Sequence, residues 1–200
     1  MQFEKRHKKT MANEEYDVFI SYSRKDYVDE NDKVIPGNVV SKIKDCLSAA
    51  GISYWFDEEG IYYGDTFTEK IPANIEKSKV FLFLASVNSN QSKWTSKEIG
   101  CAENMEKRII PVRIDKSPYN KSVMFRIADL DYVKYYSNPD KGLDDIVDAV
   151  KKALKDIEDE ERRIKEEEER KKERNKGDVK KNKKDVRKKS ADIKQNRKRQ

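Results

Sequence analysis

The sequence predicts an α/β fold in which a central parallel sheet of about five strands is covered by helices on both faces. Three observations indicate this fold: strand-like and helix-like segments alternate, the strand-like segments carry apolar residues on both faces, and the connections are short. Right-handed crossovers between parallel strands bury each strand beneath helices. The predicted class is therefore a three-layer sandwich.

The first two strands and the helix between them have the clearest pattern. Residues 16–22 (YDVFISY) form a short β-prone run with apolar side chains on both faces, as expected for a central strand. Apolar residues recur at helical spacing from Val39 to Ala50, and Gly51 follows where a helix commonly ends. Residues 52–56 then predict the second strand.

The same alternation continues through the middle of the chain. We expect a helix over residues 66–77, a third strand of almost continuous apolar content over 79–85, a helix over 94–107 and a strand over 108–114. This order of elements is typical of a flavodoxin-like sandwich. The sequence thus predicts a sheet in which every crossover contains a helix.

The part that follows residue 114 is less regular. Residues 115–131 show no clear pattern, because a Ser-Pro-Tyr-Asn sequence at 117–120 interrupts it. Residues 130–133 suggest a short edge strand, and a closing helix begins after Pro139.

Binding residues are expected in the loops that follow the predicted strands. In α/β sheets the carboxyl ends of the strands lie at one edge, and ligands bind there. None of these loops contains the G-x-G-x-x-G or G-x-x-x-x-G-K-[ST] pattern that cradles phosphates. A bound nucleotide would therefore be held in another way. The loops cover residues 21–38, 57–65, 86–93 and 115–120.

The charge distribution divides the chain. Residues 151–200 hold 22 Lys and Arg against 13 Asp and Glu, which leaves 22 and 25 for residues 1–150. Every aromatic residue lies at or before Tyr136, so a core must be built there. The predicted parts are a flexible leader (1–14), a folded domain (15–155) and a charged helix with a basic tail (156–200).

The composition excludes several classes of protein. The longest apolar run, residues 80–85, is far shorter than the roughly 20 residues that cross a bilayer, and the N-terminus does not resemble a signal peptide. We therefore expect a cytoplasmic protein without a transmembrane segment. Two cysteines are too few for a disulfide scaffold, and the single histidine, His7, argues against His-based triads and metal sites.

Four blocks of sequence resemble the Toll/interleukin-1 receptor (TIR) domain family. They occur in the family's order and at suitable distances, which makes the combination specific although each block alone is weak. The resemblance covers about residues 15–154 and implies a flavodoxin-like fold. The blocks are YDVFISYSRKD (16–26), AAGISYWFDEEGIYYGDTF (49–67), SKVFLFLA (78–85) and SKWTSKEIGCA (92–102).

The resemblance implies two alternative functions. One is enzymatic cleavage of the nicotinamide–ribose bond of NAD, giving nicotinamide and ADP-ribose or a cyclic ADP-ribose product, in signalling or defence. The other is a non-enzymatic TIR–TIR interaction module, which would be a signalling adaptor or scaffold with a basic localisation tail. The fold alone does not decide between them. In the enzymatic case NAD is the substrate, and no cofactor is expected.

Glu98 is the predicted catalytic residue, because Trp94-x-x-x-Glu98 resembles the segment that carries the glutamate of NAD-cleaving TIR domains. Nicotinamide leaves as a neutral molecule, so no general acid is needed and one carboxylate can stabilise the cationic ribose. Trp94 and Glu98 share a helix face at i and i+4, where the indole can form a wall of the pocket. From spacing alone, an exposed glutamate beside a buried tryptophan is an equally simple interpretation.

Further substrate-binding residues are implied by the resemblance. Tyr22, Ser23 and Arg24 leave the first strand where enzymatic TIR domains contact their ligand, and Arg24 is suited to a phosphate. Asp57 ends the second strand, where it can accept hydrogen bonds from a ligand or start a turn. Without the resemblance, these residues would be interpreted as solvated loop positions.

Gly64 and Phe67 belong to the segment that corresponds to the family's BB loop, between the second strand and the next helix. Gly64 permits unusual backbone angles, and Phe67 can contact the substrate or simply pack on the following helix. Receptor-type BB loops carry a Pro-Gly step, which is missing from residues 59–64. This departure disfavours the receptor-adaptor function.

The C-terminal segment combines a weak heptad pattern with strong positive charge. Apolar residues at heptad spacing over 143–164 predict a last domain helix, followed by a charged helix or weak coiled coil over 157–169. Residues 171–200 carry 15 Lys and Arg against 4 Asp and Glu, which is typical of a disordered tail. Such a tail can bind nucleic acid or an anionic membrane weakly, or only solvate the protein. Self-association through the helix would favour TIR stacking in a homo-oligomer.

Overall fold

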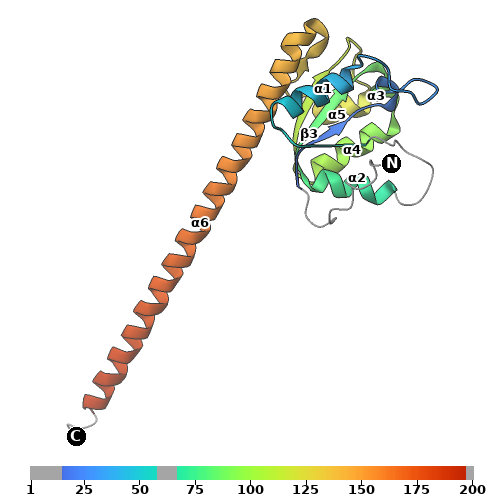
Figure 1. Ribbon diagram of the computed structural model, residues 1–200. Helices are drawn as coiled ribbons and strands as arrows, with labels where there is room; N and C mark the ends of the chain where they lie inside the picture. Colours follow the sequence, from blue (N-terminus) through green and yellow to red (C-terminus); the bar gives the residue numbers. More distant parts are fainter. Residues whose placement is uncertain (1–14, 58–66, 197–200) are drawn as a thin grey trace, which may run out of the picture. The chain divides into compact units, whose positions relative to one another are not determined.

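The computed structural model describes the backbone of residues 15–57 and 67–196, and the side chains of 15–57 and 69–174. Its described strands form one five-stranded sheet, in which every pair of neighbouring strands is parallel and the order is β2-β1-β3-β4-β5. The strands are β1 (Tyr16–Ser21), β2 (Tyr54–Phe56), β3 (Ser78–Ala85), β4 (Arg108–Arg113) and β5 (Val133–Lys134) (Figure 1).

Helices cover both faces of this sheet, which confirms the α/β sandwich expected from the sequence. One face packs against α2, α4 and α5, and the other packs against α1 and the beginning of α6 (Figure 1). The helices are α1 (Val39–Ala49), α2 (Phe67–Glu76), α3 (Val87–Gln91), α4 (Lys93–Asn104), α5 (Lys121–Ile127) and α6 (Pro139–Asn196), with 3-10 helices at Arg24–Asp26 and Tyr135–Ser137.

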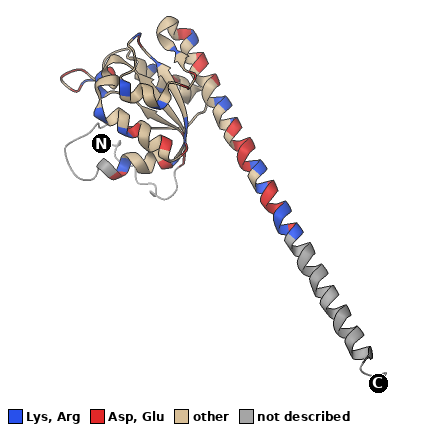
Figure 2. Ribbon diagram, turned by 180° about the vertical axis from the view of Figure 1, so that it is seen from behind, with Lys and Arg blue, Asp and Glu red and all other residues tan. Residues whose placement is uncertain are grey.

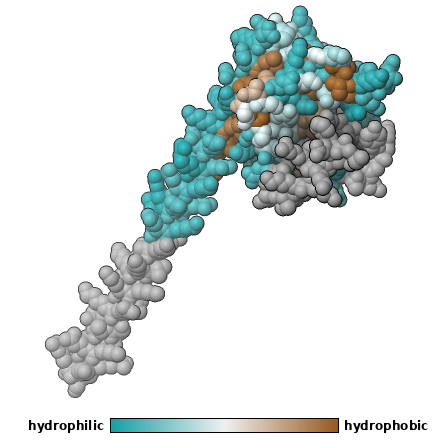
Figure 3. Space-filling model, in the orientation of Figure 1, coloured by the Kyte–Doolittle hydropathy of each residue, from teal (hydrophilic) through white to brown (hydrophobic). Residues whose placement is uncertain are grey.

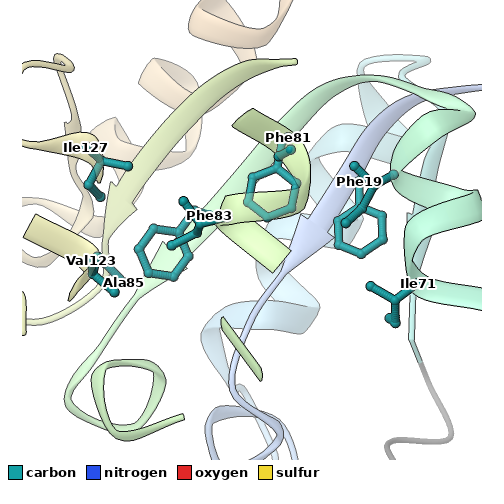
Figure 4. Close-up of a cluster of buried hydrophobic side chains, with 10 residues drawn as sticks. Phe19, Ile71, Phe81, Phe83, Ala85, Val123 and Ile127 are labelled. Atoms are coloured by element: carbon teal, nitrogen blue, oxygen red, sulfur yellow. The ribbon is translucent and has the colours of Figure 1, made fainter. Parts of the chain in front are cut away.

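The alternation of side chains along the strands builds a core on each face of the sheet. Phe19 of β1 pairs in register with Phe81 of β3, and their rings stack with centroids 5.4 Å apart. Figure 4 shows these rings and Phe83 in the layer that faces α2 and α5. The intervening residues, among them Leu82 and Leu84, are also fully buried, so β3 is apolar on both faces.

The sequence located the long elements and missed two short helices. α3 has a polar sequence, VNSNQ, and begins with a capping box formed by Ser86 and Ser89. α5 begins at Lys121 after the N-cap residue Asn120, whose side chain accepts a hydrogen bond from the Val123 amide. Both are too short for an apolar period to stand out. The edge strand is Val133–Lys134 and not the expected residues 130–133.

The chain divides into two compact units, with the boundary between Lys155 and Asp156. α6 crosses this boundary, and within the first unit its residues Ile146, Val150 and Ala153 are buried. In the second unit the helix continues to Asn196, whereas the sequence indicated a disordered tail after residue 170. Lys, Arg and Glu have high helix propensity, which favours this extension.

Charged side chains dominate the described part of α6 in the second unit (Figure 2). Salt bridges at i, i+4 join Glu166 to Arg170 and Glu167 to Lys171, and pairs of this orientation add small increments to helix stability. The described surface of the unit is predominantly hydrophilic (Figure 3). No helix among the described residues has the length and apolar character needed to span a membrane. The leader predicted over 1–14 lies outside the described residues.

Replacement of a buried aromatic residue by alanine should lower the free energy of unfolding much more than replacement of an exposed one. Phe81 is 0% exposed, so Phe81→Ala is expected to lower the free energy of unfolding by about 3–5 kcal/mol. Phe125 of α5 is 91% exposed, and Phe125→Ala should change it by less than about 0.5 kcal/mol. Urea denaturation of the two variants measures the difference. Equal losses would contradict the assignment of Phe81 to the core.

Candidate active site

The sheet order creates a crevice at the carboxyl ends of its central strands. β1 lies between β2 and β3; the chain passes from β1 to α1 on one face of the sheet, and from β3 through α3 to α4 on the other face. The loops after β1 and β3 therefore diverge and leave an opening between them. A cavity of about 340 Å³ lies at this edge of the sheet. Six of the predicted site residues line it: Tyr22, Ser23, Arg24, Asp57, Trp94 and Glu98.

Glu98 reaches the cavity from the second turn of α4. The hydroxyl of Ser21, the last residue of β1, donates a hydrogen bond of 2.7 Å to Oε2 of Glu98. The pKa of the Glu98 carboxyl is raised to about 7: burial is the main cause, the hydrogen bond from Ser21 opposes the shift, and the negative charge of Asp57 adds to it. Glu98 is therefore a carboxyl group that gains and loses its proton near neutral pH.

Aromatic rings form two parts of the cavity wall. Trp94 lies one turn before Glu98 on α4, and the ammonium of Lys97 lies 4.4 Å from the centre of its ring. Trp55 of β2 also lines the cavity and stacks on Phe19 with ring centroids 4.8 Å apart. Sequence reasoning missed Trp55 as a site residue, because a tryptophan within a predicted strand was interpreted only as part of the sheet.

Tyr22 connects the loop after β1 to the end of β2. Its hydroxyl donates a hydrogen bond of 2.5 Å to the backbone carbonyl of Asp57. Its ring stacks on Phe56 at 5.0 Å and meets Tyr27 edge-on at 5.9 Å. Burial is the main cause that raises the pKa of the Tyr22 hydroxyl, so Tyr22 stays neutral. These contacts place Asp57 beside Tyr22 at the cavity edge.

Arg24 borders the cavity but pairs with an acidic residue of its own loop. Its Nη2 lies 3.1 Å from Oδ1 of Asp32, and the Asp32 side chain is 64% exposed. Exposed ion pairs of this kind contribute little to stability, so another anion can readily replace the Asp32 carboxylate at Arg24. Ser23 lies next to Arg24 and is almost fully buried. Lys25 also lines the cavity and adds a second positive charge that the sequence reasoning did not single out.

Asp26 joins two of the loops that surround the cavity. Its carboxylate accepts hydrogen bonds of 2.6 Å from the hydroxyl of Ser86 and 2.6 Å from the side-chain amide of Asn88. Burial raises the pKa of Asp26, and the two hydrogen bonds oppose this shift. Asn88 itself lines the cavity. The contacts span 60 and 62 residues of sequence, so no local pattern could have indicated them.

Two predicted site residues cannot be placed at the cavity. Gly64 lies outside the described residues, and for Phe67 only the backbone is described, at the start of α2. Their roles stay predictions. Within the described ranges, there is no group of three or more His, Cys, Asp or Glu residues that could hold a metal ion.

A family model described as "TIR domain" matches residues 18–147. This range spans the sheet, the cavity and the helices around it. The chain therefore belongs to the TIR domain family, as the four sequence blocks predicted.

Several relatives within this family carry names that state an activity. The chain is 28% identical over 90 residues to "Probable 2' cyclic ADP-D-ribose synthase TcpO" of Methanobrevibacter olleyae, a match that covers 45% of this chain and 24% of the relative. It is 28% identical over 102 residues to "2' cyclic ADP-D-ribose synthase AbTIR" of Acinetobacter baumannii, covering 49% and 35%.

A third relative is "NAD(+) hydrolase tir-1" of Caenorhabditis elegans, 32% identical over 111 residues, which covers 51% of this chain and 10% of that protein. Because the matches span about a third or less of each relative's length, they concern the TIR domain and not the whole proteins.

Removal of the Glu98 carboxyl should alter how stability depends on pH. The folded chain holds this proton up to a pKa of about 7, against 4.5 for an ordinary glutamate, so the group destabilises the fold progressively as pH rises through this window. Glu98→Gln removes the penalty. Relative to wild type, we expect the variant to gain on the order of 2 kcal/mol between pH 5 and pH 8.

Urea denaturation of both proteins at the two pH values measures this gain, since the other titrating groups cancel in the difference. A pH-independent difference between wild type and Glu98→Gln would show that Glu98 titrates normally in the folded chain.

Proposed function

We propose that this TIR domain cleaves the bond between nicotinamide and ribose in NAD, releasing nicotinamide and ADP-ribose or a cyclic ADP-ribose product. The observation that carries the proposal is the carboxyl group of Glu98, which lines a cavity at the carboxyl edge of the sheet with a pKa of about 7. The names of the relatives support it, because they state NAD hydrolysis or cyclic ADP-ribose synthesis for proteins that share this domain.

The chemistry of the bond explains why one carboxylate is sufficient. Nicotinamide carries a positive charge while it is attached to the ribose and departs as a neutral molecule, so the leaving group needs no proton. The positive charge moves to the ribose as the bond breaks. A carboxylate beside that carbon stabilises the developing charge and can orient the oxygen that attacks it. Water as the attacking oxygen gives ADP-ribose, and an oxygen of the same molecule gives a cyclic product.

The ionised form of Glu98 is the active form in this proposal. With a pKa of about 7, Glu98 becomes ionised in the neutral pH range. The cationic nicotinamide ring of NAD favours ionisation further when it binds nearby. The cleavage rate is therefore expected to rise with pH across this range.

Charged and aromatic groups around Glu98 suit the rest of the dinucleotide. Trp94 and Trp55 offer flat apolar surfaces to a pyridine or purine ring. Arg24 and Lys25 can contact the pyrophosphate, with Arg24 leaving Asp32 to do so. In this arrangement Asp57 and Tyr22 would lie against the ribose.

The substitution Glu98→Gln tests the catalytic role directly. It preserves the size of the side chain and a hydrogen-bond acceptor for Ser21, but it removes the charge. We expect the release of nicotinamide from NAD to fall by at least about 100-fold. Glu103→Gln is the matched control, because Glu103 lies on the same helix, pairs with Arg126 and does not line the cavity.

Chromatography of nicotinamide and ADP-ribose products measures both variants. Equal rates for wild type and Glu98→Gln would remove Glu98 from the mechanism. If no nicotinamide is released at any protein concentration, the domain instead serves as a non-enzymatic TIR–TIR interaction module.

We also propose that the second unit holds copies of the chain together in a homo-oligomer. Ile164 lies on a described, charged part of α6 with half of its surface exposed, and Ile157 lies one heptad before it. A single charged helix in water is marginally stable, so pairing with another copy would stabilise it. Residues 171–200 could also contact nucleic acid or an anionic membrane weakly through their positive charge.

Truncation after Lys155 tests the role of the second unit. We expect the full chain to have a molecular mass of at least two copies by light scattering, and the truncated chain to have the mass of one. The rate of NAD cleavage per chain should then depend less steeply on concentration after truncation. An identical number of copies for both proteins would contradict self-association through α6.

A further inference from the structure

We infer that Ser21 is the positioning residue for Glu98: its hydroxyl, buried behind the cavity, holds the carboxylate in the orientation and charge state that cleavage requires. This inference rests on the proposed function, because it assigns a second residue to the same site. It concerns the last residue of β1, which is not among the residues that line the cavity.

The location of Ser21 fits an indirect role. Ser21 is 1% exposed and pairs in register with Phe83 of β3, at the centre of the sheet. The cavity lining includes its neighbours Ile20 and Tyr22 together with Glu98, but it does not include Ser21. The serine therefore lies behind the carboxylate and reaches the substrate only through it. The pairing with Phe83 on the β3 side, together with the pairing of the preceding Ile20 with Phe56 of β2, holds this serine in place.

The hydrogen bond selects one state and one orientation of the carboxyl group. An ionised carboxylate can only accept hydrogen bonds, and the Ser21 hydroxyl donates to Oε2 at 2.7 Å. The bond therefore favours the charged form and occupies one of the two oxygens. Oε1 takes no part in this bond, so in this proposal it is the oxygen that stabilises the ribose. A hydroxyl group attached to a rigid strand is well suited to this function, since little conformational freedom is lost.

The surroundings of Glu98 shift its pKa in opposite directions. Burial and the charge of Asp57 raise the pKa of Glu98, and the Ser21 hydrogen bond lowers it. Burial is the main cause that raises the pKa values of Tyr22 and Cys101, and the charge of Glu98 adds to both shifts, so both groups stay protonated near neutral pH. The cationic side chains that line the cavity or flank Trp94 are Arg24, Lys25 and Lys97.

Removal of the Ser21 hydroxyl should therefore leave the groups that raise the pKa of Glu98 unopposed. For Ser21→Ala we expect the titration midpoint of Glu98 to rise by about one pH unit. Carbon-13 NMR of protein labelled at the glutamate carboxyl groups measures this midpoint without any substrate. The signal that disappears in Glu98→Gln identifies the resonance.

Cleavage of NAD by the full chain provides the second readout. In Ser21→Ala the pH–rate profile should shift upward by the same amount as the titration midpoint. At pH 7 we expect kcat to fall about 10-fold, with KM nearly unchanged and part of the loss recovered at pH 9. A general loss of structure would lower the rate at every pH and would not move the profile.

A matched control and a conservative variant complete the experiment. Ser78 is 2% exposed, lies at the start of β3 and donates a hydrogen bond of 2.7 Å to the carbonyl of Asn74. Ser78→Ala removes a similar buried hydroxyl from the opposite edge of the sheet, and it should leave the midpoint and profile unchanged. Ser21→Cys keeps a weak donor of similar size, so its midpoint should lie between those of wild type and Ser21→Ala.

The outcomes separate this inference from the proposed function. An unchanged Glu98 midpoint in Ser21→Ala and Ser21→Cys, or an equal shift in Ser78→Ala, would overturn the role of Ser21. A shifted midpoint together with a shifted rate profile supports it. If wild type releases no nicotinamide while the midpoint still shifts, Ser21 controls Glu98 and NAD cleavage is the part that fails.

Discussion

A parallel sheet gathers the carboxyl ends of its strands at one edge, and this constraint decides where the chemistry of the molecule can be. The order β2-β1-β3 places β1 between two neighbours, and the residues at its end meet the backbone that follows β2 and a side chain of α4. Tyr22 bonds to the end of β2, and Ser21 bonds to Glu98. The same apolar packing that stabilises the sheet also removes water from around these polar groups.

That removal of water creates a conflict between stability and chemistry at Glu98. Burial disfavours a charged carboxylate, whereas the proposed stabilisation of a cationic sugar requires one. Among the described residues, the structure balances the two with a hydrogen bond from Ser21 and with an environment that leaves the proton weakly held near neutral pH. A chain selected for stability alone would place an apolar side chain here. The retention of an acidic residue at such a position is typical of functional sites.

How much of the fold and of the site could be predicted from the sequence depends on whether a feature is set by neighbouring residues or by the three-dimensional fold. The helical spacing of Trp94 and Glu98 is local, and the apolar runs of β1 and β3 identify the strands, so both were predicted. The ion pair of Arg24 with Asp32 was not predicted, because the geometry of the loop determines it. Trp55 was missed because a strand pattern does not tell which part of a ring faces a cavity. α3 and α5 were missed because capping by Ser86 and Asn120, and not an apolar period, defines their starts.

The carboxylate of Asp26 makes the two loops on either side of the β1–β3 opening depend on each other. Ser86 and Asn88 share this one acceptor with hydrogen bonds of equal length, and the 3-10 turn that carries Arg24 ends at Asp26. Widening of the entrance on this side therefore has to break two hydrogen bonds together, which makes the movement cooperative. The coupling between the two loops therefore depends on a residue that does not itself line the cavity.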